Sequence, residues 1–157
     1  MKGRGFRVAF GVAAVMAVVA TPGIAVARDA TAPEIVLAGF SSQQYPTFFK
    51  LAGNGQRLMV GGMALDMNCT SGSEFVLHDA FARIRIKPNG RLRATFAVPP
   101  TAVANGGTVS GSDSLTARLA GRGTELSGVW RLQLSYSFTN GMSDQCDSGP
   151  VRFTATR

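Results

Sequence analysis

Residues 126–138 read LSGVWRLQLSYSF, and polar and apolar side chains alternate along most of this stretch, with Val129 as the exception. Successive side chains of a β-strand point to opposite faces of a sheet. Alternation with a period of two therefore predicts a long strand with one buried face and one hydrated face. The residues that share the predicted buried face are Leu126, Gly128, Trp130, Leu132, Leu134, Tyr136 and Phe138.

The same alternation recurs through the chain, whereas helical periodicity is almost absent. It predicts a hairpin over 82–98 and further strands at 34–40, 46–51, 56–68, 74–77, 114–120 and 150–156. Many short strands separated by glycine-rich turns indicate an all-β, antiparallel domain, either an up-and-down barrel or a two-sheet sandwich of about eight strands. Residues 99–113 begin with two prolines and are rich in small and polar residues, so we expect a mobile loop there.

The predicted hairpin turns at Pro88-Asn89-Gly90. A three-residue loop places Ile86 opposite Leu92 and aligns the apolar sets of the two strands, whereas a two-residue loop would put them out of phase. We therefore predict a type I turn with Gly90 in the left-handed conformation. The residues expected on the shared apolar face are Ala82, Ile84, Ile86, Leu92, Ala94, Phe96 and Val98.

The opposite face of this hairpin is basic. Its cationic residues are Arg83, Arg85, Lys87, Arg91 and Arg93. The predicted register places Arg85 opposite Arg93 and Lys87 opposite Arg91, and like charges directly opposite each other are unfavourable. Such a face is either simply solvated or binds an anionic partner, such as a phosphate-rich envelope polymer or lipid headgroups. Nucleic acid is not expected, because the aromatic side chains of 126–138 lie on an apolar face and do not interleave with the basic one.

The first 27 residues have the three parts of a secretory signal peptide. A basic start is followed by an apolar run at 8–20 and by the small residues Ala25-Val26-Ala27. We expect cleavage after Ala27, a short N-terminal arm at 28–33 and a single β domain at 34–157. The mature protein would then be exported to the periplasm, the cell wall or the medium. The apolar run is shorter than the about 20 residues that a membrane span needs, and the sequence has no second such run, so we expect no transmembrane segment in the mature chain.

The chain has two cysteines, Cys69 and Cys146. Two cysteines in an exported domain most often pair, so we predict a disulfide, with free or intermolecular thiols as the alternative. On a strand, Met59, Met63 and Met67 share one face with Cys69, which predicts that they pack in the core. A metal site would need further ligands at close spacing, and the sequence does not suggest one.

Several segments together resemble a group of small exported bacterial proteins. These segments are Asn54-Gly-Gln-Arg-Leu, Cys69, Glu125-Leu-Ser-Gly-Val-Trp130 and Cys146-Asp-Ser-Gly-Pro-Val-Arg-Phe-Thr-Ala-Thr-Arg157. Those proteins share two separated cysteines and a terminal Cys-Asp-(Ser/Thr)-Gly-x-Val-x-aromatic-x-Ala-x-Arg pattern. The resemblance covers most of residues 54–157. It implies an exported β domain with a disulfide, and it implies no activity.

The sequence does not suggest catalysis or a cofactor. His78 is the one histidine, and on a strand its neighbour Asp79 would point the opposite way, so we expect a surface histidine. The sequence has no nucleophile elbow, phosphate loop, dinucleotide fingerprint or zinc signature. Three hypotheses follow. The first is an exported, non-catalytic envelope or extracellular protein that binds an anionic surface or polymer, and the second is a lipocalin-like carrier of a small apolar ligand. The third is an enzyme, for which the sequence shows no set of catalytic residues. The carrier requires an internal cavity larger than ~300 Å³.

Overall fold

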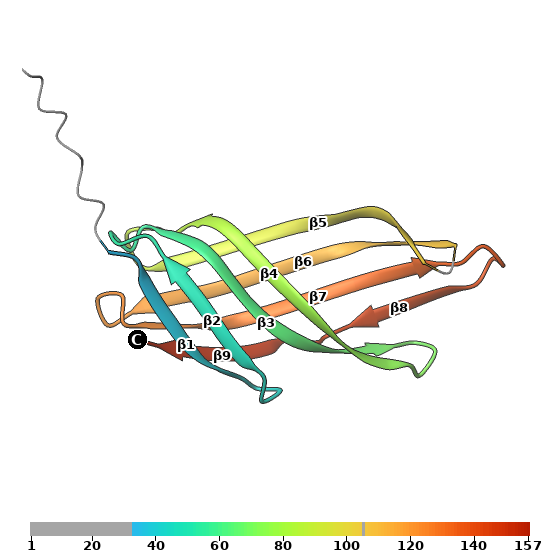
Figure 1. Ribbon diagram of the computed structural model, residues 1–157, viewed down its shortest axis with the longest axis horizontal. Helices are drawn as coiled ribbons and strands as arrows, with labels where there is room; N and C mark the ends of the chain where they lie inside the picture. The colour runs from blue at the N-terminus through green and yellow to red at the C-terminus, as the bar shows by residue number, and fades with distance from the viewer. Residues whose placement is uncertain (1–32, 105) are drawn as a thin grey trace, which may run out of the picture. The chain divides into compact units, whose positions relative to one another are not determined.

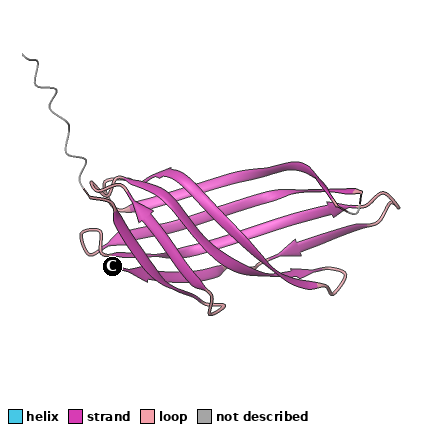
Figure 2. Ribbon diagram, in the orientation of Figure 1, coloured by secondary structure: helices cyan, strands magenta, loops and turns pink. Residues whose placement is uncertain are grey.

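The computed structural model describes residues 33–104 and 106–157. The predicted signal peptide (1–27) and all but the last residue of the predicted arm (28–33) lie outside the described residues. Within the described ranges all regular secondary structure is β-strand, as predicted (Figure 2). In that part of the chain there is also no helix that is long and apolar enough to cross a membrane. The strands are β1 (Ile35–Ser41), β2 (Pro46–Leu51), β3 (Arg57–Cys69), β4 (Glu74–Arg85), β5 (Arg91–Val103), β6 (Gly107–Ala120), β7 (Glu125–Ser137), β8 (Ser143–Asp147) and β9 (Val151–Thr156).

The strands form one antiparallel sheet in the order β4-β3-β2-β1-β9-β7-β6-β5. The short strand β8 pairs with both β3 and β7, so β3, β2, β1, β9, β7 and β8 close into a ring. Beyond the ring, β4 pairs only with β3 and β5 pairs only with β6. Figure 1 shows β2–β4 crossing in front of β5–β7. The fold is therefore a closed barrel of six strands whose sheet continues into extra strands on either side.

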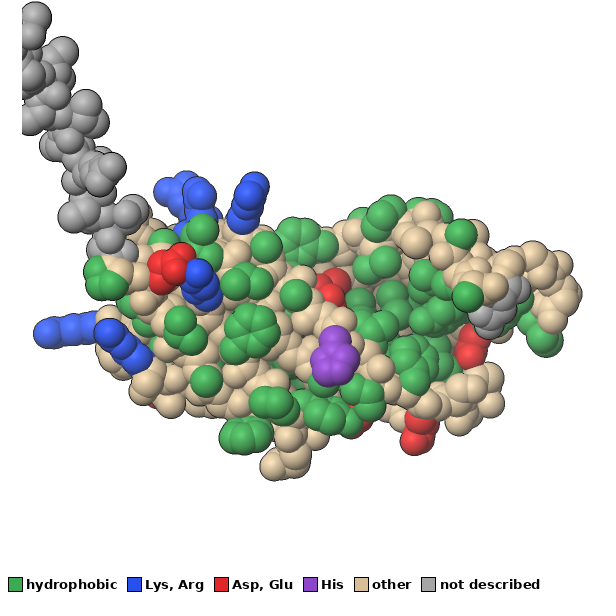
Figure 3. Space-filling model, in the orientation of Figure 1, with side chains coloured by type: hydrophobic (Ala, Val, Ile, Leu, Met, Phe, Trp, Pro, Cys, Tyr) green, Lys and Arg blue, Asp and Glu red, His purple; other side chains and the backbone are tan. Residues whose placement is uncertain are grey.

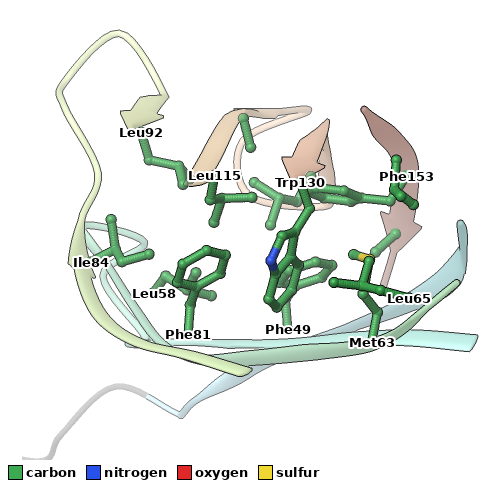
Figure 4. Packing of buried hydrophobic residues seen from close by; sticks show 14 of the residues in the cluster. Phe49, Leu58, Met63, Leu65, Phe81, Ile84, Leu92, Leu115, Trp130 and Phe153 are labelled. Atoms are coloured by element: carbon green, nitrogen blue, oxygen red, sulfur yellow. The ribbon is translucent and has the colours of Figure 1, made fainter. Parts of the chain in front are cut away.

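The core lies inside this curved sheet (Figure 4). Trp130 is fully buried and its ring packs 4.3 Å from that of Phe81, while Phe49 packs 4.7 Å from Phe153. Most of the predicted buried face of 126–138 is in the core, and its fully or nearly fully buried members are Leu126, Trp130, Leu132 and Leu134. The alternation that predicted this strand thus also identified the side chains that fill the barrel.

The predicted disulfide is present. Cys69 on β3 and Cys146 on β8 are directly opposite each other, with their Cα atoms 4.0 Å apart. Only two residue pairs join β3 to β8, and the bridged pair is one of them. The bridge therefore reinforces the ring at the strand pair that has the fewest paired residues.

The predicted turn at 88–90 is correct, but the hairpin is wrong. The Lys87 N–H donates to the Arg91 carbonyl at 2.8 Å, the Gly90 N–H donates to the Lys87 carbonyl at 2.8 Å, and Gly90 has φ 77°. Beyond the turn, β4 pairs with β3 and β5 pairs with β6, so Arg85 is not opposite Arg93. Periodicity shows which side chains share a face, but it does not show which strand lies alongside.

The predicted apolar face of β4 is wrong at Ala82. Arg83 has φ 59°, and this left-handed residue interrupts the alternation. As a result Phe81 and Ile84 are both buried although they are three residues apart, and Ala82 is exposed. A register shift between β2 and β3 has the same effect on the neighbouring strand: Met63 and Met67 are buried as predicted, whereas Met59 is only half-buried.

The loop predicted at 99–113 is wrong as well. β5 continues through Pro99 and Pro100 to Val103, and β6 begins at Gly107. Proline is tolerated on an edge strand, where a missing N–H removes no ladder bond, and the register shifts between Val98 and Thr101. Gly111 allows β6 to approach β7, since an added Cβ would lie 2.0 Å from the Gln133 carbonyl oxygen. Two further differences are that β4 is continuous from 74 to 85 and that β8 was not predicted.

The double variant C69S/C146S tests how much the ring depends on the bridge. The bridged residues are 77 positions apart. Constraint of the unfolded chain by a loop of this size is worth roughly 4–5 kcal/mol, so we expect the melting temperature to fall by at least about 10 °C. Thermal unfolding followed by circular dichroism measures this, and wild type in excess reductant should match the variant. Equal melting temperatures for the oxidised wild type and the variant would show that β3–β8 pairing holds without the bridge.

Candidate functional site

Three turns lie together at one end of the barrel and surround an open pocket of about 820 Å³. They are the β2–β3, β4–β5 and β6–β7 turns, and the pocket is lined by residues from all three. Its cationic side chains are Arg85, Lys87 and Arg122. Segments that are far apart in sequence thus supply positive charge to one hollow.

Strand pairing brings more arginines to the same end. Arg57 on β3 is directly opposite Arg85 on β4, and Arg91 on β5 is directly opposite Arg118 on β6. All four side chains are exposed. Each pair places like charges side by side, which is unfavourable unless an anion or water screens them. We call this region the basic end, defined as Arg57, Arg85, Lys87, Arg91, Arg118 and Arg122.

The structure divides the predicted basic face. Arg85 and Lys87 line the pocket, whereas Arg83, Arg91 and Arg93 do not. Sequence reasoning missed Arg57, Arg118 and Arg122, because their proximity depends on which strands are neighbours. One signal was nevertheless available: Arg57 follows the Asn54-Gly55 turn and Arg122 lies in the Gly121-Arg122-Gly123 turn, so both flank chain reversals.

Few of these charges are neutralised by acids. The ion pairs among the described residues are Lys50 with Glu34, at 2.6 Å, and Arg131 with Asp147. In the same part of the chain, no member of the basic end has an acidic oxygen within ion-pair distance. Figure 3 shows the basic side chains of the visible face gathered over one half of the molecule. An uncompensated cluster of this kind raises the local concentration of anions.

A second group of interest lies on the inner side of the extra strands β4 and β6, beyond the six-strand ring, and was also missed. Asp113 on β6 is only 5% exposed, and the indole N–H of Trp130 donates to its Oδ1 at 2.8 Å. Asp79, on β4, approaches it across the interior. Burial raises the pKa of Asp113 to about 8, with further contributions from the charge of Asp79 and from a hydrogen bond to it. Asp113 therefore keeps its proton near neutral pH, and we expect it to donate that proton in a hydrogen bond to Asp79.

The surroundings of this carboxyl pair are apolar. Asp113 lies between Phe96 and Leu132 in the sheet, and Asp79 is opposite Met63. In the described part of the chain, the buried Oδ2 atom of Asp79 accepts no hydrogen bond from an N–H or hydroxyl group, and protonated Asp113 is the donor that we expect for it. The pair lies between β4 and β6, two strands that have no backbone pairing with each other.

His78 is exposed, as predicted, while Asp79 faces the interior from the next position. The two side chains therefore point to opposite faces of β4, as the alternation required. The alternation could have predicted that Asp79 faces inward, because Asp79 has the same parity as the inward positions 75, 77 and 81. The sequence could not show that Asp113 is the partner of Asp79. The two acids are 34 positions apart, and the whole of β5 lies between them in the chain.

Asp144 lies at the other end of the molecule and joins β8 to the β3–β4 turn. Its Oδ1 accepts from the Thr70 hydroxyl at 2.6 Å and its Oδ2 from the Ser71 hydroxyl at 2.6 Å. These bonds lower the pKa of Asp144 to about 2. Asp144 also lies near the sulfur atoms of Cys69 and Cys146, but those atoms are joined in the disulfide and are not available as thiolate ligands.

Comparison of the chain with protein-family models, with curated proteins and with solved structures finds no significant match. The resemblance to small exported bacterial proteins therefore stays a prediction. Function must be inferred from the basic end and the surfaces around it.

The variant D113N tests whether the carboxyl pair shares a proton. Because the pKa of Asp113 is raised from the ordinary value near 4 to about 8, its contribution to stability is complete below pH 4 and is lost as the pH rises towards 8. The free energy of unfolding of wild type should therefore fall by a few kcal/mol over this range, and that of D113N should fall much less. Urea unfolding at pH 4, 6 and 8 measures the difference.

The matched control is D144N. The pKa of Asp144 is lowered to about 2, so the stability that it contributes is present above pH 4 and is lost only in stronger acid. D144N should therefore be less stable than wild type and show the same slope between pH 4 and 8. Parallel slopes for wild type and D113N would mean that Asp79 and Asp113 do not share a proton.

Proposed function

We propose that this protein is a non-catalytic binding protein that holds an anionic surface or polymer of the cell envelope at its basic end. The observation that carries the proposal is the pocket between three turns, where Arg85, Lys87 and Arg122 meet without an acidic partner in the described part of the chain. A pocket with this lining fits phosphate or carboxylate groups, because guanidinium groups bind them through paired hydrogen bonds.

Polar side chains of the turns support the same chemistry. The Asn54 side-chain oxygen accepts from the Gln56 N–H at 3.0 Å, and that of Asn89 accepts from the Arg91 N–H at 3.1 Å. With their oxygens engaged by the backbone, the NH₂ groups of both side chains remain to donate into the pocket that they line. The pocket therefore offers neutral donors beside its cations, and both kinds of group suit an anion.

The energetics of the fold favour a ligand at this end. The opposed pairs Arg57–Arg85 and Arg91–Arg118 each cost some tenths of a kcal/mol up to about 1 kcal/mol when unscreened. A bound polyanion removes this cost in addition to forming its own contacts. The disulfide fits an oxidising compartment outside the cytoplasm, which is where the predicted signal peptide would direct the chain. Envelope polymers and lipid headgroups are rich in phosphate, so they supply the required charge.

The carrier hypothesis has weaker support. It needs an enclosed cavity larger than ~300 Å³, but the middle of the barrel is filled by Trp130, Phe49 and Phe81 (Figure 4). The large pockets found among the described residues open to the surface. An apolar ligand would have to displace packed aromatic side chains, whereas an anion would find the basic end open.

The variant R85Q/K87Q removes two cations of the pocket and tests the proposal. With inorganic polyphosphate as the probe, we expect wild type to bind in 50 mM NaCl and to lose most of its affinity in 300 mM NaCl, because salt screens exposed charges. R85Q/K87Q should bind at least tenfold more weakly than wild type at low salt. Isothermal titration calorimetry measures both effects.

The charge-matched control is R131Q/R152Q, which removes two arginines outside the basic end. The affinity of this variant for polyphosphate should fall no more than about twofold, because these two arginines do not contact the ligand and affect binding only through the net charge of the protein. Two results would contradict the proposal: no binding of polyphosphate by wild type at 50 mM NaCl, or an equal loss in the two double variants. The second result would mean that only the net charge matters.

A further inference from the structure

We propose that the partner of the basic end is an anionic lipid bilayer, and that the outer face of β1–β4 lies flat against it. The proposal rests on the proposed function and names its partner. It depends on a second surface, which we call the apolar face, made of outward-facing residues of β1–β4. Its members are Val36, Ala38, Phe40, Pro46, Phe48, Val60, Gly62, Ala64, Val76 and Ala80.

The apolar face contains large side chains that are well exposed. Phe40 is 65% exposed, Val36 57%, and Phe48 and Val76 49% each. Strand register places these residues in continuous rows, one of which runs from Ala38 through Phe48 and Gly62 to Ala80. Figure 3 shows hydrophobic side chains spread over this side of the molecule. The surface is therefore a patch of neighbouring apolar side chains, with the exposed His78 between Val76 and Ala80 as a polar group within it.

The centre of the apolar face is hollowed. A pocket of about 710 Å³ is bordered by Phe48 and Val76 and floored by the small residues Gly62, Ala64 and Ala80. Phe48 lies over Gly62, where an added Cβ would be 2.9 Å from its ring. Small residues beside exposed aromatic rings leave room for inserted groups such as acyl chains.

The other side of the same protein shows what a water-facing surface requires here. The outward positions of β6 are polar and include Ser110, Ser112, Ser114 and Thr116, and those of β7 include Gln133 and Ser135. A sheet face in contact with water is normally polar in this way. The apolar face of β1–β4 departs from the pattern that β6 and β7 follow, and extended exposed patches of this kind mark interaction sites.

Charge at the edge of the apolar face identifies the occupant. Lys50 is in the same row as Val36 and Val60, but its charge is neutralised by Glu34. The cations at the end of the face are the Arg57–Arg85 pair, and within the described part of the chain neither arginine has an acidic partner. A flat membrane surface in contact with the apolar face would therefore also contact cations of the basic end. Asp66 and Glu74 lie towards the opposite end of these strands, so the charge is graded along the face. Exposed apolar side chains beside clustered cations are the pattern by which proteins lie on anionic membranes.

Vesicle binding by the full chain, as processed by its host, tests this proposal. We compare vesicles of equal parts phosphatidylglycerol and phosphatidylcholine with vesicles of phosphatidylcholine alone, using co-sedimentation. Wild type should bind the anionic vesicles at least tenfold more tightly. F40S/F48S should lose at least fivefold of that affinity while it binds polyphosphate as well as wild type does. R85Q/K87Q should lose affinity for both probes.

Two single variants test whether any exposed apolar side chain, rather than the apolar face in particular, supports vesicle binding. F40S and M142S each replace one well-exposed apolar side chain, and Met142, at 61% exposure, lies outside the apolar face in the turn between β7 and β8. F40S should weaken vesicle binding about threefold, and M142S should leave it unchanged. Thermal unfolding confirms that the variants fold, which is expected because the substituted side chains are exposed.

The outcomes separate this proposal from the one on which it rests. Undiminished vesicle binding by F40S/F48S would overturn the docking of the apolar face while the basic end kept its role. Polyphosphate binding without vesicle binding would make a soluble polymer the partner. A wild-type dimer that F40S/F48S dissociates, with no vesicle binding, would make a second copy the occupant. Loss of polyphosphate binding in R131Q/R152Q equal to that in R85Q/K87Q would instead overturn the proposed function.

Discussion

The barrel depends on the contact between β3 and β8. Every other neighbouring pair of the ring is joined by at least four residue pairs, whereas β3 and β8 share two, one of which is the disulfide-bonded pair. Without this contact the nine strands would form an open sheet with the core along one side. With it, β3 is tied to β7 through β8, and the layer of β1–β4 is held over the side chains of β7. The burial of Trp130 and Phe81 against each other follows from this closure.

The sheet remains open between β4 and β5, and contacts between interior side chains replace the missing backbone pairing there. No backbone ladder joins these two strands in the described structure. Instead Phe81 of β4 packs 5.2 Å from Phe96 of β5, and Asp79 of β4 shares a hydrogen bond with Asp113 of β6. This polar link is stabilising while Asp113 keeps its proton, because two facing carboxylates repel each other. We therefore expect the stability of the seam to fall as the pH rises towards 8.

The protein surface carries two distinct regions, the basic end and the apolar face. Closing the sheet brings three turns and their cations to one end, and it leaves β1–β4 with apolar side chains on both faces. Inner positions such as Leu37 and Phe49 fill the core, while Val36 and Phe48, beside them in the chain, remain exposed. The exposed side chains of these two surfaces lie outside the buried core. Core packing therefore does not explain the basic end or the apolar face, and a binding role for both is our proposal.

The alternation of side chains was sufficient to predict the fold class, the strands at 46–51 and 126–138, and the buried side of Trp130. These features are local, because strand periodicity and turn residues such as Gly90 act within a few positions of the chain. The neighbours of each strand were not predictable, so the hairpin over 82–98 and the loop at 99–113 were wrong. Arg83 interrupts the period through its own backbone conformation, and Pro99 and Pro100 are tolerated only because β5 is an edge strand. The basic end, the Asp79–Asp113 pair and the apolar face all depend on contacts between distant segments, which exist only once the ring has closed.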